Sequence, residues 1–288
     1  MFYNIYKTTL KTILRSRSAW LALALILVAL GGDVVGGHYG YYDMTLGEMI
    51  YDTDPRFVLD FVTYRHNVLQ NTACAVMMNY PLPLFAVISA LVVLLRDFGD
   101  RYFEIEKAGN IRPFTYYIAR LLGVMSVVMI VALGMTLLGV YWYVFSRGGV
   151  DGYSAGFVLK DVFLRTWKYL LGLMLPILLA VVSATLCLGN LFHNALFAAL
   201  GSLAFIVANY LYCYIGNVTG WQTYFDYFST HPNKLRWVIA AYDREDPIAT
   251  MNAFFTTPQL GMICVGIAVG AALLYGIVAH LCIRRREI

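Results

Sequence analysis

Six long apolar runs constrain this chain more than any other feature. A helix rises about 1.5 Å per residue and needs roughly 20 apolar residues to cross about 30 Å of hydrocarbon. Only the first run, interrupted by Gly31, Gly32 and Asp33, is shorter than that. The pattern predicts an all-α, polytopic membrane protein with six transmembrane helices. The runs are Ala19–Val34, Ala73–Leu95, Leu121–Phe145, Tyr169–Leu188, Ala195–Ile215 and Leu260–Ala279.

The composition agrees with lipid as the main solvent. Apolar residues make up 60% of the chain and charged residues 13%, against roughly 45–50% and 25% in soluble domains. The five cysteines lie in or beside the apolar runs and never at CxxC spacing. We therefore interpret them as buried hydrophobic residues rather than disulfides or metal ligands.

The distribution of charge predicts the orientation, because Lys and Arg mark the cytoplasmic side. With the N-terminus inside, twelve of the 21 Lys and Arg residues fall in inner segments and nine in outer loops. Of the 17 acids, five lie inside and twelve outside. Both termini should therefore be cytoplasmic.

Residues 1–18 precede the first run and carry a helical pattern. Lys7, Lys11 and Arg15 recur every four residues on one face, with apolar residues elsewhere. This pattern predicts a helix along the inner membrane interface. A basic flank that anchors the first span, or a cleavable signal, are the alternatives.

The segments between the runs differ in length. The predicted outer loops are 35–72, 146–168 and 216–259, and the one substantial inner loop is 96–118. Within it, dense charge without Gly or Pro predicts a short helix that Gly109 ends. From the residues alone, this helix is either a solvated connector or a docking element.

Polar and helix-breaking residues within the runs are the candidates for a substrate path. Pro81 and Pro83 should break or kink the second span, because each removes a backbone donor. The candidates along the path are Asn79, Pro81, Pro83, Ser183 and Asn209.

Enzyme motifs are not found in the sequence. It has no G-x-x-x-x-G-K-[ST] loop for ATP phosphates and no G-x-S-x-G frame for a serine nucleophile. The histidines never occur at HExxH spacing, and Asp97-Phe98-Gly99 lacks the other kinase motifs. We expect no catalytic residues, no metal site and no cofactor bound by this chain.

Several features together resemble the type-two ABC export permeases. They are the basic N-terminal helix running into LRSRSAW, six spans, the inner segment E-x-E-K-A-G-N-x-R-P-x-x-Y-Y-x-A-R-L-L, a long aromatic last outer loop and the tail IRRREI. The resemblance covers essentially the whole chain. It departs from the usual pattern at Ala108-Gly109-Asn110, where the family has an acidic residue and a Gly-Thr-like turn.

The resemblance implies partners and a docking site. It implies a coupling helix that docks on a separate cytosolic ABC ATPase subunit, which holds ATP and Mg. It also implies a second permease chain, identical or paralogous, in the lipid membrane, and no nucleic acid. The docking residues matched by the family pattern are Arg101, Phe103, Glu104, Ile105, Glu106, Lys107 and Gly109.

The resemblance thus implies a permease subunit of an ATP-driven exporter in the bacterial inner membrane. The alternative is a non-transporting membrane sensor or assembly scaffold that binds a peptide or envelope component. The identity of the substrate is open, and peptides, lipid-linked glycans, drugs and lipids all fit.

Overall fold

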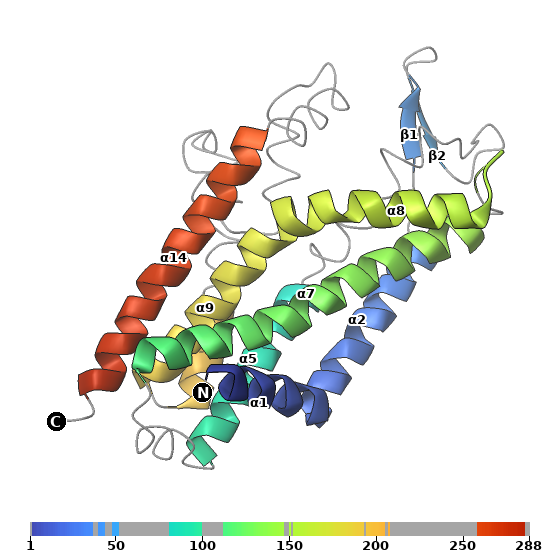
Figure 1. The fold of residues 1–288 in the computed structure, drawn as a ribbon. Helices are drawn as coiled ribbons and strands as arrows, with labels where there is room; N and C mark the ends of the chain where they lie inside the picture. The colour runs from blue at the N-terminus through green and yellow to red at the C-terminus, as the bar shows by residue number, and fades with distance from the viewer. Residues whose placement is uncertain are drawn as a thin grey trace.

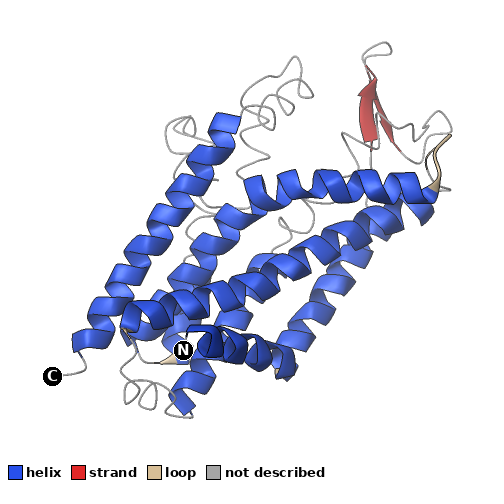
Figure 2. Cartoon of the chain, viewed as in Figure 1, coloured by secondary structure: helices blue, strands red, loops and turns tan. Residues whose placement is uncertain are grey.

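The computed structural model describes residues 2–36, 40–43, 48–51, 81–99, 112–146, 150, 152–192, 194–204, 207 and 258–285. This part of the chain is mainly helical, as predicted, with one two-stranded hairpin (Figure 2). The labelled helices are α1 (Phe2–Arg15), α2 (Arg17–Gly36), α5 (Pro81–Gly99), α7 (Pro113–Ser146), α8 (Ala155–Tyr169), α9 (Leu175–Phe192) and α14 (Pro258–Arg285). A shorter apolar helix covers Ala195–Ala204.

A sharp elbow at Ser16 separates α1 from α2. The Ser16 hydroxyl accepts a hydrogen bond from the Ala19 amide at 3.4 Å and so caps the start of α2. The indole of Trp20 donates to the Leu14 carbonyl at 2.8 Å, which joins the two helices across the elbow. The predicted N-terminal helix is confirmed as a helix, and its basic residues Lys7, Lys11 and Arg15 are exposed.

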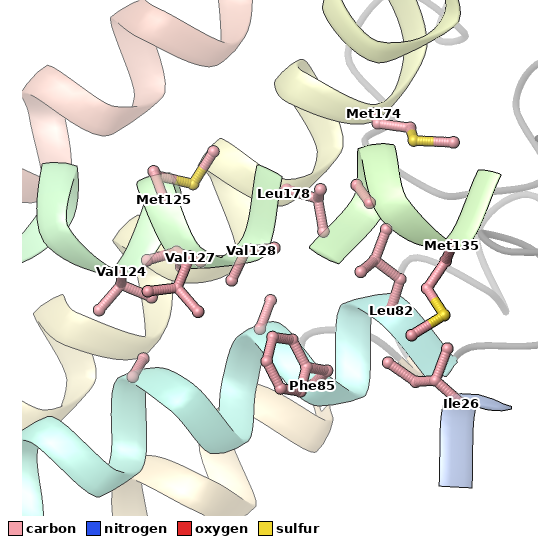
Figure 3. Close-up of a cluster of buried hydrophobic side chains, with 14 of the residues drawn as sticks. Ile26, Leu82, Phe85, Val124, Met125, Val127, Val128, Met135, Met174 and Leu178 are labelled. Carbon is pink, nitrogen blue, oxygen red and sulfur yellow. The ribbon is translucent and has the colours of Figure 1, made fainter. Parts of the chain in front are cut away.

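The central helix is α7, which is 34 residues long and packs against all six other labelled helices. Its inner face and that of α5 form the middle of the apolar core (Figure 3). There Phe85 and Leu82 of α5 lie beneath Val124, Val128 and Met135 of α7. α14 packs mainly on α9, and α1 packs across α7 and α5.

The two ends of the bundle carry different elements. α1 and the C-terminal end of α14 lie at one end, together with the end of α5 and the start of α7 (Figure 1). α8 and the hairpin lie at the other end (Figure 1). We call these the terminal end and the distal end.

Two predicted outer loops contain regular structure that we did not expect. Segment 35–72 contains the antiparallel hairpin of β1 (Gly40–Asp43) and β2 (Glu48–Tyr51), in which Gly40 pairs with Tyr51. Segment 146–168 is not simply a loop, because it contains most of α8. The Ser154 hydroxyl caps α8 by accepting from the Phe157 amide at 3.3 Å. Of loop 216–259, residues 216–257 lie outside the described part.

Each of the six apolar runs overlaps a described helix. The number of helices that could each cross a membrane is a separate question. Among the described residues, one helix, Pro113–Trp142, is by itself long and apolar enough to cross a membrane. The other apolar helices in that search are shorter: Arg17–Val28, Leu178–Phe192, Ala195–Ala204 and Val269–Cys282.

The prolines of the second run lie in the first turn of α5. Pro81 is the first residue of α5, and Pro83 is buried in its first turn. The first four amide groups of a helix have no partner within it, so proline costs no helical hydrogen bond at either position. Residues 73–80 of the second run lie outside the described part, so a break or kink at these prolines stays a prediction.

Between α8 and α9, the turn Leu170–Met174 is π-helical. Such a turn is wider than an α-helical one and often marks a change of direction. α8 and α9 meet there at an angle (Figure 1). This bend falls inside the N-terminal part of the predicted fourth run, Tyr169–Leu188.

Candidate functional site

The predicted docking residues lie just beyond the described ends of two helices. α5 ends at Gly99, and α7 begins at Pro113. The whole set of docking residues, Arg101, Phe103, Glu104, Ile105, Glu106, Lys107 and Gly109, is outside the described residues. What the structure describes is how the two flanks of this segment are held.

The predicted path residues do not form a site in the described part of the chain. Asn79 and Asn209 lie outside it. Ser183 is buried in α9, where its hydroxyl donates to the Ala180 carbonyl of the same helix at 3.1 Å. Pro81 and Pro83 lie in the first turn of α5. Ser183 thus takes part in helix packing here, and its role on a path stays a prediction.

A buried ion pair joins the two helices that flank residues 100–111, which include the predicted docking residues. Arg120, in the second turn of α7, donates from Nη2 to Oδ1 of Asp97, near the end of α5. The two side chains are only 3% and 5% exposed. Each of these buried charges is compensated by the other, because either one alone would lie unpaired in a low-dielectric environment.

Tyr116 makes further contacts with both members of the pair. The Tyr116 hydroxyl donates to Oδ2 of Asp97, so both carboxylate oxygens are used. Tyr116 and Arg120 are four residues apart on α7 and therefore share a face. The guanidinium lies over the Tyr116 ring, 5.1 Å from its centroid, within the range of a cation–π contact.

The same network reaches α1. Arg120 Nη1 donates to Thr9 Oγ1 at 2.8 Å, and Arg96 of α5 donates to Thr12 Oγ1. Thr9 and Thr12 in turn donate to carbonyls one turn back in α1, each at 2.8 Å. Each hydroxyl therefore acts as donor and acceptor at once. We call the set Thr9, Thr12, Arg96, Asp97, Tyr116 and Arg120 the base cluster.

Close packing brings α1 near enough to α7 for these bonds. Gly123 of α7 lies against Thr9, and a Cβ on Gly123 would come within 2.7 Å of the Thr9 methyl carbon. Farther along the contact, the Tyr6 hydroxyl donates to Ser126 Oγ at 3.0 Å. Glycine at position 123 is therefore what allows the two helices to approach.

The base cluster couples three helices mechanically. The ends of α5 and α7 that flank residues 100–111 are tied to each other and to α1 through buried charged hydrogen bonds. A displacement of that segment is passed to three helices together, or it has to break the Asp97–Arg120 pair. The base cluster is therefore placed where it could pass such a displacement on to the three helices.

Sequence reasoning missed this cluster although its signal was present. Asp97 counted as an inner-side charge and as part of a dismissed kinase motif, and Arg120 counted as an inner-side charge and as part of the segment that resembles the permeases. Two opposite charges at the facing ends of successive apolar runs are the pattern that indicates such a pair. The threonines of α1 gave no such signal, because their role depends on how α1 packs.

Comparisons of the chain with models of protein families, with curated proteins and with solved structures find no match. Within the described ranges, no group of three or more His, Cys, Asp or Glu side chains could hold a metal ion. Among the described residues, the base cluster is therefore the best candidate for a functional element of this chain.

Proposed function

We propose that this chain is the membrane permease subunit of an ATP-driven exporter. A separate cytosolic ABC ATPase would dock on residues 101–109, and a second permease chain would complete the path. The observation that carries the proposal is the base cluster, which ties both flanks of the docking segment to α1. An element pushed by a motor needs such a rigid connection to the helices that it moves.

The exposed surface of the helices supports a membrane location. Large apolar side chains point outward along the helices, Ile130 of α7 with 70% of its surface exposed. Soluble monomers rarely expose extended apolar patches. The set includes Leu21, Leu25 and Val28 of α2, Leu196 and Leu200 of the helix Ala195–Ala204, and Leu273, Leu274 and Ile277 of α14.

The shape of the bundle supports six spans with both ends in the cytoplasm. α1 and the C-terminal end of α14 lie at the same end of the bundle (Figure 1), which an even number of spans requires. α2 and α14 are 20 and 28 residues long along the backbone, enough to cross about 30 Å of hydrocarbon. We assign the terminal end to the cytoplasm because it carries the predicted excess of Lys and Arg.

The test is a purified complex from the native membrane. The affinity-tagged chain is extracted in detergent, and the co-purifying subunit is checked for a Walker loop and for Mg-ATP hydrolysis. We expect F103A/E106A to keep normal membrane insertion and to lose most of the co-purifying ATPase, because it removes an apolar and a charged group from the docking helix. K160A in α8, at the distal end, is the matched control and should retain the ATPase.

Two results would contradict the proposal. If the chain purifies without any Walker-loop protein, the sensor or scaffold alternative gains. If F103A/E106A retains the ATPase and its hydrolysis at the wild-type level, residues 101–109 are only a connector, and the permease loses its transmission site.

A further inference from the structure

The helix α8 turns an apolar face away from the rest of the bundle. Phe157, Phe163, Leu164 and Trp167 are each 40–60% exposed. The rings of Phe163 and Trp167 make an edge contact with centroids 5.8 Å apart. Four large side chains on one 15-residue helix are too costly to leave in water and need a covering partner.

The sequence of α8 separates into three arcs around its axis. Val158, Val162, Thr166 and Leu170 form a buried stripe that faces the bundle. At 3.6 residues per turn, the exposed apolar residues share a second arc. Positions 161, 165 and 168 share the third arc and hold Asp, Arg and Lys. An apolar arc beside a charged arc is typical of a helix that lies in a membrane interface.

One residue within the apolar arc distinguishes lipid from protein as the covering partner. Lys160 lies between the aromatic residues and is exposed. At a membrane surface its long side chain can reach the headgroups while its methylene groups stay in the apolar layer. In a contact with a second copy, the same ammonium would be buried and would need a partner charge.

The position of α8 in the fold agrees with an interface. It lies at the distal end, near the end of α7 (Figure 1), where Tyr141 and Trp142 are also exposed. The ring of Tyr153, which lies just before α8, stacks on the ring of Phe157 in α8, with the two centroids 5.1 Å apart. Trp and Tyr concentrate at membrane–water boundaries, because their rings are apolar and their N–H or O–H groups are polar.

We propose that α8 lies in the headgroup layer of the leaflet at the distal end, with its apolar arc toward the acyl chains and its charged arc toward water. The proposal rests on the membrane location argued above but not on the ATPase partner. It makes α8 an interfacial anchor that precedes the bend into α9.

Spin-label accessibility in liposomes of phosphatidylethanolamine and phosphatidylglycerol tests this placement. The five native cysteines are replaced, and single cysteines are introduced at Leu164 on the apolar arc, Asp161 on the charged arc and Ile130 in the middle of α7. Collisions with oxygen report hydrocarbon, and collisions with a water-soluble nickel chelate report water.

We expect the label at Leu164 to collide with oxygen several-fold more often, relative to the nickel chelate, than the label at Asp161. Its depth should be about 5–10 Å below the headgroups and shallower than that at Ile130. A label at Leu164 that is as accessible to nickel as Asp161 places α8 in water and overturns the proposal. Protection from both reagents means protein cover by another copy, which overturns it too. A water-exposed label at Ile130 would instead refute the membrane location itself.

Discussion

Two sides of α7 hold their neighbours by different means. Tyr116 and Tyr117 are adjacent in the chain, and a helix turns about 100° between them. Tyr116 faces α1 and α5 and donates to the carboxylate of Asp97. Tyr117 faces α9 and α14, where its hydroxyl lies 3.3 Å from the Ser183 carbonyl and 3.4 Å from the Ala272 carbonyl.

The second side is held by packing of neutral groups. Gly276 of α14 lies against the rings of Tyr117 and Phe114, and a Cβ there would be 3.0 Å and 3.2 Å from their nearest atoms. The carbonyls that Tyr117 reaches already belong to helices, so its hydrogen bonds are long and secondary. The α1 and α5 side thus adds buried charged groups to its apolar packing, whereas Tyr117 holds the α9 and α14 side through contacts of neutral groups.

The largest effect should come from breaking the ion pair. Arg120→Ala and Asp97→Ala should each lower the free energy of unfolding by about 3–5 kcal/mol, because each leaves one charge buried and uncompensated. Urea or thermal unfolding of the purified protein in detergent micelles measures the loss. The double variant D97L/R120M, which leaves no charge behind, should recover much of it. A loss in the double variant close to the sum of the two single losses would show that the two residues do not act as a pair.

Tyrosine-to-phenylalanine changes compare the two sides directly. Tyr116→Phe removes a hydrogen bond to a charged group and should cost about 1.5–3 kcal/mol, whereas Tyr117→Phe removes neutral bonds and should cost about 1 kcal/mol or less. Both variants keep the ring and its packing. The same unfolding measurement ranks them, and a larger loss for Tyr117→Phe would reverse the comparison.

Glycine-to-alanine changes test how closely each side packs. Gly123→Ala should destabilise the protein by about 1–3 kcal/mol, because its Cβ would collide with Thr9. Gly276→Ala should cost less, since its nearest atoms are aromatic edges that can shift slightly. Gly134, with nothing within 4 Å of a Cβ, is the control, and Gly134→Ala should be neutral or stabilising by up to about 1 kcal/mol.

A second change identifies the atom responsible at Gly123. Thr9→Ser removes the methyl carbon nearest to the new Cβ and keeps the hydroxyl that Arg120 reaches. G123A/T9S should therefore be more stable than G123A. No recovery would show that the methyl carbon is not the atom responsible, because serine keeps the Cβ of residue 9, which lies 2.8 Å from the new Cβ.

Sequence patterns predicted the parts of this fold that follow from local composition. All six apolar runs overlap helices, because a long apolar run on any face favours a buried or lipid-facing helix. α1 was predicted from its four-residue spacing of basic residues. These features need no knowledge of which helices touch.

The parts that were missed depend on tertiary contacts or on short mixed segments. The hairpin of β1 and β2 forms from four-residue strands, which carry little periodicity. α8 mixes aromatic, charged and aliphatic residues, and its burial stripe is visible only once α7 is beside it. The base cluster required the ends of α5, α7 and α1 to meet, and charge counts by segment do not report that.

The proposed function requires that the terminal end, with the base cluster and residues 100–111, lies on the cytoplasmic side of a membrane. Single cysteines at Gly40, Asn233 and Lys107, in a background without the native cysteines, test it in intact cells with a membrane-impermeant thiol reagent. The account predicts labelling at Gly40 and Asn233, and labelling at Lys107 only after the membrane is opened. Labelling at Lys107 in intact cells would contradict the orientation and, with it, the docking of a cytosolic ATPase.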